Sequence, residues 1–271
     1  MKKIVILAAL SAAGIIASSV AYGTTDGRDK AMRAEVFEYR DGDVVCEGYI
    51  VYDETIKGKR PGVLVVHEWT GLGEYEKRRA KEIAEMGYVV LAADIYGKGV
   101  RAQTPEEASS LATKFRSDRA TLRSRANAAL EALKSHPLVD PGRVAAIGYC
   151  FGGGTVLELA RSGAELAGVV SFHGNLDTPN PEDAKNVNCK VLVLHGADDP
   201  LVPQEQVLAF QDEMRNGGVD WQMIFYGGAV HSFTNPASGN DPSKGVAYNE
   251  QADRRSWEAM TSFFTELFEA R

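Results

Sequence analysis

The feature that most constrains this fold is a repeated alternation of short apolar runs with longer helical segments. Residues 63–66 and 191–194 are continuously apolar, which is typical of strands buried on both faces of a sheet. Residues 74–86 lie between two such runs and form a charged segment that Gly87 closes, as at the end of a helix. Strands that alternate with helices predict a mostly parallel sheet with helices on both faces, an α/β fold.

The predicted elements follow one another without a long linker or an internal repeat. Residues 36–52 alternate around a turn at residues 41–43, which predicts an antiparallel hairpin at the sheet edge. We predict about eight strands in all, the other six at residues 63–66, 88–93, 143–149, 166–172, 191–195 and 219–226. Helices are predicted at residues 74–86, 105–133, 151–161, 203–216 and 248–269. One domain is therefore expected over residues 22–271.

The N-terminal 21 residues resemble a secretory signal. Lys2 and Lys3 precede an apolar stretch at residues 4–16, and small residues lead up to Ala21. This pattern predicts a signal peptide that is cleaved after Ala21. The alternative is an uncleaved membrane anchor, but the apolar stretch is shorter than the roughly 20 residues that a spanning helix needs. We expect a periplasmic or secreted protein that has no membrane attachment after cleavage.

The charge and composition of the chain limit the classes of molecule that it can bind. The formal charge is −7, and loss of Lys2 and Lys3 with the signal would make it −9. An acidic protein is poorly suited to nucleic acid or anionic lipid. Apolar residues make up 44% and charged residues 25% of the chain, as in ordinary globular proteins. We expect a small-molecule substrate and no nucleic acid partner, and the oligomeric state stays open.

Residues 148–152 read Gly-Tyr-Cys-Phe-Gly and separate a predicted strand from a predicted helix. A strand-to-helix turn of the form G-x-nucleophile-x-G is a nucleophile elbow, here with Cys150 in place of the usual serine. The helix N-terminus adds positive potential, which favours a thiolate. The alternatives are a buried structural cysteine and a phosphate-binding glycine loop. The second lacks the Lys-Ser/Thr of a Walker sequence.

Two candidate partners follow Cys150 in the order that α/β-hydrolases use. Asp199 follows the strand at residues 191–195, and His231 follows the strand at residues 219–226. Asp199 and its neighbour Asp198 could instead form a turn or cap a helix. His231 could be a surface histidine, and three others also end strands: His67, His173 and His195. The histidines show no metal-binding spacing, so no metal is expected.

The three residue types suit nucleophilic catalysis. A thiol with a pKa near about 8.5 is mostly protonated at pH 7, so a histidine must take its proton and later protonate a leaving alcohol. A carboxylate fixes the tautomer of that histidine. Cys150, His231 and Asp199 are thus the predicted nucleophile, base and acid.

These motifs together resemble the dienelactone hydrolase family, whose members are carboxymethylenebutenolidase-like α/β-hydrolases. The resemblance covers about residue 36 to the C-terminus and rests on Val-His-Glu-Trp at 66–69, Ala-Asp-Ile-Tyr at 93–96, the elbow at 148–152, Asp-Pro-Leu-Val-Pro at 199–203 and His-Ser-Phe at 231–233. It implies a Cys-His-Asp triad of Cys150, His231 and Asp199. It also implies hydrolysis of carboxylic esters or lactones without a cofactor.

The resemblance also assigns residues around the triad. Glu68 matches a glutamate that pairs with the resting thiol in the family and is displaced by substrate, so we expect it to modulate Cys150. The backbone N–H groups of Trp69 and Phe151 would form the oxyanion hole.

The matching substrate contacts differ from those of dienelactone enzymes. Where those enzymes bind a carboxylate with arginines, this chain has Lys98 and Asn235. Lysine supplies a point charge without a bidentate fork, and asparagine carries no charge. Tyr96 and Lys98 remain candidate substrate contacts, while the identity of the substrate stays open.

Other functions remain open beside this one. A carboxylesterase, thioesterase or peptidase can share the fold, because a fold does not fix its substrate. A non-catalytic binding protein would have no need of three triad positions in order. The chain has three cysteines, so an exported form keeps at least one unpaired. We expect Cys46 and Cys189 to be buried thiols rather than a disulfide.

Overall fold

One eight-stranded sheet in the order β1-β2-β4-β3-β5-β6-β7-β8 runs through the computed structural model, which describes residues 31–269. The strands from β3 to β8 pair in parallel, while β1 and β2 form an antiparallel hairpin that joins β4. The strands are β1 Met32–Asp41, β2 Val44–Asp53, β3 Arg60–Val66, β4 Val89–Ala93, β5 Val139–Tyr149, β6 Gly168–Phe172, β7 Lys190–Gly196 and β8 Trp221–Tyr226. The predicted α/β-hydrolase architecture, edge hairpin included, is confirmed.

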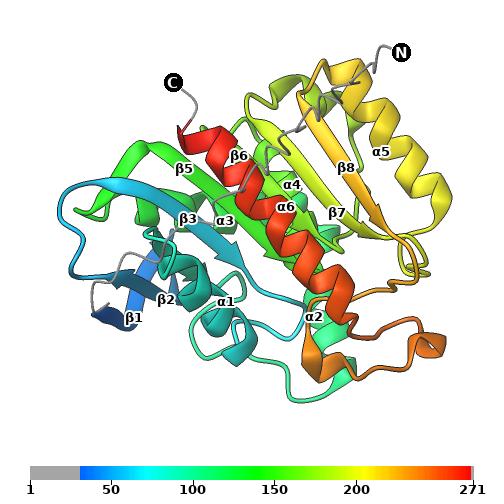
Figure 1. The fold of residues 1–271 in the computed structure, drawn as a ribbon, viewed down its shortest axis with the longest axis horizontal. Coiled ribbons are helices and arrows are strands. Elements are labelled where there is room, and N and C mark those ends of the chain that lie inside the picture. The colour runs from blue at the N-terminus through cyan, green and yellow to red at the C-terminus, as the bar shows by residue number, and fades with distance from the viewer. Residues whose placement is uncertain (1–30, 270–271) are drawn as a thin grey trace, which may run out of the picture.

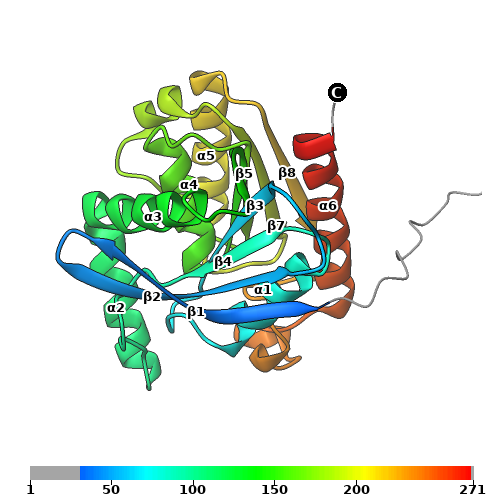
Figure 2. The same cartoon turned by 90° about the vertical axis from the view of Figure 1, so that its left-hand side faces the viewer.

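Helices cover both faces of this sheet (Figures 1 and 2). The α-helices are α1 Glu74–Ala84, α2 Pro105–Ser117, α3 Arg119–Lys134, α4 Phe151–Arg161, α5 Gln204–Gly217 and α6 Glu250–Glu269. Short 3-10 helices, which the sequence patterns did not indicate, occupy Pro181–Asn186, Pro236–Ser238 and Pro242–Lys244. Helices α1 and α6 lie on one face, and α3, α4 and α5 lie on the other (Figure 2).

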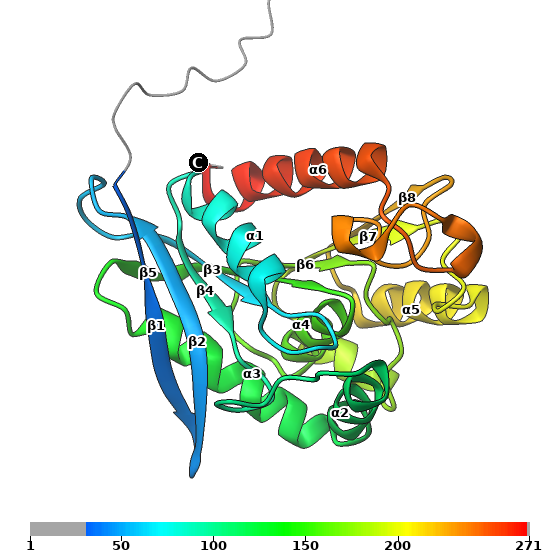
Figure 3. The same cartoon turned by 90° about the horizontal axis from the view of Figure 1, so that it is seen from below.

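The single helix predicted at residues 105–133 is wrong. Asp118 interrupts it with a non-helical backbone (φ −117°, ψ 78°), and its side chain accepts hydrogen bonds from the backbone N–H and the hydroxyl of Thr121. Asp118 therefore caps a new helix, as Asp commonly does. The apolar spacing continues across the break, so periodicity could not reveal it. Because of the break, α2 turns away from α3 (Figure 3).

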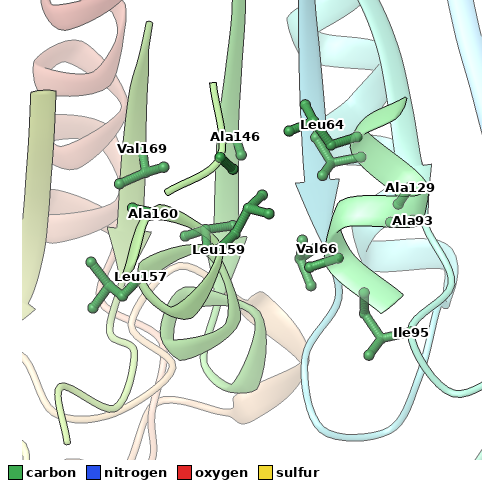
Figure 4. Packing of buried hydrophobic residues seen from close by; sticks show 14 of the residues in the cluster. Leu64, Val66, Ala93, Ile95, Ala129, Ala146, Leu157, Leu159, Ala160 and Val169 are labelled. Carbon is green, nitrogen blue, oxygen red and sulfur yellow. The ribbon is translucent and has the colours of Figure 1, made fainter. Parts of the chain in front are cut away.

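Two apolar layers hold the helices to the sheet. Because successive strand residues point to opposite faces, Leu64 and Val66 of β3 pack on the α3 and α4 side, whereas Val63 and Val65 pack on the α1 and α6 side. Figure 4 shows the first layer, where Ala129 of α3 and Leu159 of α4 lie beside the strands. Full burial of such side chains is worth about 1.5–3 kcal/mol each. This packing fixes where the strands end, and thereby the loops that follow them.

The structure tests the prediction for the cysteines but not the one for the N-terminal signal. The predicted signal at residues 1–21 lies outside the described residues. Cys46 and Cys189 are free and buried, as expected. No helix between residues 31 and 269 is both long and apolar enough to cross a membrane.

Candidate active site

Cys150 occupies a strained turn between β5 and α4. Its backbone has φ 53° and ψ −114°, a conformation that residues other than glycine rarely adopt. The turn is so tight that a Cβ atom on Gly148 would lie 2.0 Å from the carbonyl oxygen of Gly152. A Cβ atom on Gly152 would lie 2.2 Å from the carbonyl oxygen of Val66 in β3. The small residues on either side of Cys150 are therefore required by close backbone approach.

The three predicted triad residues meet above the carboxyl ends of the parallel strands. His231 Nε2 lies 3.0 Å from Cys150 Sγ, and His231 Nδ1 lies 2.8 Å from Asp199 Oδ2. Asp199 and His231 are buried, whereas Cys150 is partly exposed. Burial lowers the pKa of His231, but Cys150 and Asp199 outweigh that effect and raise this pKa above its ordinary value. The arrangement can therefore take a proton from the thiol.

Asp199, rather than Asp198, faces the histidine. The backbone N–H of Leu201 donates to Asp199 Oδ1, so the carboxylate binds the backbone with one oxygen and His231 with the other. Asp198 accepts the backbone N–H of Gly228 on the surface, and its side chain makes no hydrogen bond to His231 or Cys150. Two adjacent aspartates thus have different structural roles.

A second histidine supports the elbow from below. His173 Nδ1 accepts the backbone N–H of Cys150 at 3.1 Å, so its Nε2 donates to Thr234 Oγ1 at 2.7 Å. Burial, and then the proximity of His231, hold the pKa of His173 well below its ordinary value. His173 is thus a neutral acceptor that fixes the backbone of Cys150. The sequence offered only its position at the end of a strand.

Glu68 lies in the same cavity as Cys150 but is turned toward other partners. Its carboxylate accepts hydrogen bonds from the Ser232 hydroxyl at 3.1 Å and the Asn235 amide at 2.6 Å. Burial raises the pKa of Glu68, and these two hydrogen bonds partly oppose the rise. In this structure the thiol therefore contacts His231, and no hydrogen bond joins it to Glu68.

The site opens into a cavity of about 650 Å³ between the strand ends and α2. Cys150, His231, Glu68, Trp69 and Phe151 all line it. Several further lining residues lie on α2 and were not predicted from the sequence patterns: Ser109, Ala112, Thr113 and Arg116. A cavity of this size suits a small organic substrate.

Comparison with known proteins identifies the family of this chain. The model of the dienelactone hydrolase family matches residues 46–268. The chain belongs to the dienelactone hydrolase family. Membership of this family establishes that the protein is a hydrolase. It does not establish the substrate, because one fold can serve many substrates.

Three relatives illustrate the range of the family. The crystal structure of the dienelactone hydrolase-like promiscuous phosphotriesterase P91, from metagenomic libraries, has 47% sequence identity and a TM-score of 0.84, covering 88% of this chain and 99% of that one. A structure named m3DLH has 45% identity and a TM-score of 0.85, with the same coverage. A protein of Aquifex aeolicus, provisionally named a carboxymethylenebutenolidase, is 28% identical over 236 residues, which span 85% of this chain and 97% of the relative.

The two expected substrate contacts lie elsewhere than the resemblance implied. Lys98 is half exposed and pairs with Glu38 and Glu47 of the edge hairpin, so it is not among the residues lining the cavity. Tyr96 is buried and donates its hydroxyl to the carbonyl of Trp69 at 2.9 Å. Tyr96 thus supports the cavity wall, and the cation that lines the cavity in the described structure is Arg116, 3.4 Å from Asp177.

The backbone N–H groups of Trp69 and Phe151 have no hydrogen-bond partner within residues 31–269. Both residues line the cavity beside Cys150. Unpaired N–H groups beside a nucleophile can stabilise a developing oxyanion.

Proposed function

We propose that the protein hydrolyses carboxylic esters or lactones through Cys150, His231 and Asp199. The observation that carries this proposal is the continuous contact from Cys150 Sγ through His231 to Asp199 at the mouth of the cavity. A contact of this kind is the geometric signature of an activated nucleophile.

The proposed reaction has two steps that use the same groups. The Cys150 thiolate attacks the carbonyl carbon while His231 holds the thiol proton, and the oxyanion forms beside the Trp69 and Phe151 N–H groups. Expulsion of the alkoxide, which takes the proton from His231, leaves a thioester on Cys150. His231 then removes a proton from water, which attacks the thioester and releases the acid and the free thiol. No metal or cofactor enters the sequence of steps.

The proposed hydrolysis can be tested with purified protein on a panel of p-nitrophenyl esters, lactones, thioesters and peptides. Cys150→Ala should lose nearly all activity, because it removes the thiol that forms the acyl-enzyme. Cys189→Ala is the matched control, since Cys189 is buried directly before β7 and is not among the residues that line the cavity. Equal activity of Cys150→Ala and wild type would overturn the proposal, while turnover of thioesters or peptides alone would shift the substrate class.

Phosphotriester hydrolysis is a second candidate. It is favoured by the 47% identity with a relative described as a promiscuous phosphotriesterase. Paraoxon belongs in the same panel, and Cys150→Ala should abolish its turnover as well if both reactions share the nucleophile.

Export is proposed on the sequence of residues 1–21 alone. Expression of the full chain in a Gram-negative host should give a periplasmic protein that begins at Tyr22. Mass spectrometry of the fractionated cells tests this, and an intact Met1 terminus would contradict it.

A further inference from the structure

The segment at residues 68–73 connects β3 to α1 and carries both Glu68 and Trp69. Its two ends are bound by one side chain that no motif of the site includes. Glu76 Oε1 accepts the backbone N–H of Glu68 at 2.9 Å, and Glu76 Oε2 accepts the backbone N–H of Gly73 at 2.9 Å. The Glu76 carboxylate thus binds the first and the last residue of the segment.

Helix capping explains only half of this arrangement. Gly73 is the N-cap of α1, and a glutamate at N3 commonly accepts the N-cap N–H. The hydrogen bond to Glu68 does not cap the helix, because Glu68 lies at the other end of the loop, close to the end of β3. Glu76 is moreover 2% exposed, which is unusual for a capping glutamate on a helix surface.

Other contacts fix the middle of the same segment. Tyr96 donates to the carbonyl of Trp69 at 2.9 Å, and the backbone N–H of Ala102 donates to the carbonyl of Thr70 at 3.0 Å. Trp69 therefore has its carbonyl bound on one side, while its N–H has no partner in the part of the chain that the structure describes. The backbone plane of Trp69 depends on anchors at both ends, and Glu76 supplies them.

We propose that Glu76 is a positioning residue for the reaction: its carboxylate holds the 68–73 segment so that the Trp69 N–H meets the oxyanion. This inference rests on the proposed esterase function. Glu76 acts through the loop and does not line the cavity. Its role differs from that of Phe151, whose N–H is fixed directly by the start of α4.

Glu76→Gln tests the proposal with almost no change in volume. Glutamine keeps one carbonyl oxygen but turns an NH₂ donor toward the second N–H, so one end of the segment is released. A displacement of about 1 Å at a reacting group can cost about 10²-fold in rate. We expect kcat for a p-nitrophenyl ester to fall by about 10²-fold with little change in KM.

Acylation and deacylation measured separately distinguish this role from an effect on the thiol. Both steps pass through an oxyanion, so both rates should fall by similar factors in Glu76→Gln. A variant that altered only thiol activation would slow acylation alone, and that result would overturn the proposal. The matched control is Glu74→Gln in the same helical turn. Glu74 is 88% exposed and its ion pair in the described structure is with Lys77, so this variant should keep the wild-type kcat.

Residue-resolved amide hydrogen exchange gives a second test, which also works on the wild type alone. The amides of Glu68 and Gly73 should be protected in the wild type, and exchange faster in Glu76→Gln while the β5 amides stay unchanged. Unprotected amides in the wild type, or unchanged exchange in the variant, would overturn the proposal. Absence of ester turnover in the wild type would refute the proposed function instead, and the exchange result would still stand.

Discussion

A buried carboxylate that binds only neutral N–H groups should make stability depend on pH. The pKa of Glu76 is raised from 4.5 to about 7, first by burial and then by the Glu68 carboxylate, while the N–H groups of Glu68 and Gly73 act in the opposite direction. Tyr149 of β5 also lies near, and burial raises its pKa, so it stays neutral.

The sign follows from proton linkage. Between pH 4.5 and about 7 the folded state binds a proton at Glu76 that the unfolded state has released, so stability is lost as the pH rises through this range. A tenfold change in proton affinity is worth 1.36 kcal/mol, which makes the full loss about 3 kcal/mol. Glutamine cannot ionise and so avoids this loss.

The assay is urea unfolding of wild type, Glu76→Gln and Glu74→Gln between pH 5 and pH 8. The free energy of unfolding of Glu76→Gln should rise relative to wild type by about 2–3 kcal/mol over this range. Comparing variants cancels the titration of other groups. Glu68→Gln should shrink the change, because it removes a charge that raises the Glu76 pKa. Parallel curves for wild type and Glu76→Gln would refute the reasoning.

Three further predictions follow from other contacts. Asp199→Asn should lower kcat/KM by several orders of magnitude, whereas Asp198→Asn should leave ester hydrolysis near wild type; the reverse order in a steady-state assay would mean that the wrong acid was chosen. Glu68→Gln should make Cys150 react faster with iodoacetamide in the absence of substrate; an unchanged alkylation rate would exclude a thiol-modulating role. Arg161→Met should destabilise the fold by about 3–5 kcal/mol in urea unfolding, because it leaves the buried Glu213 without its cation while Glu158 keeps Arg123; a loss no larger than that of its exposed control, Arg215→Met, would contradict this.

The parts of the site that lie within one local motif could be predicted from the sequence. The elbow at Cys150 follows from small residues between a strand and a helix, and Asp199 and His231 follow from their places after strands. Parallel strands bring such loops to the same edge of a sheet, so chain order was enough to bring the triad together.

The parts that depend on tertiary geometry could not be predicted. Asp118 breaks the α2–α3 segment without disturbing its apolar spacing, and α2 contributes Arg116 to the cavity lining. Lys98 was matched to a substrate contact by its place after a motif, but the edge hairpin supplies Glu38 and Glu47 and binds it there. The neighbours of a side chain such as Lys98 depend on which strands pair in the sheet, and the periodicity of a sequence does not reveal that pairing.

The buried glutamates within residues 31–269 divide into two kinds. Glu158 and Glu213 lie against Arg161, so their charges are compensated within the layer of α4 and α5. Glu76 makes no ion pair within residues 31–269, and Glu68 binds a hydroxyl and an amide. An uncompensated buried charge costs stability, so it persists where its hydrogen bonds serve another purpose. Glu68 belongs to the segment that carries Trp69, and Glu76 binds both ends of that segment, which is the arrangement expected if the proposed oxyanion site depends on this loop.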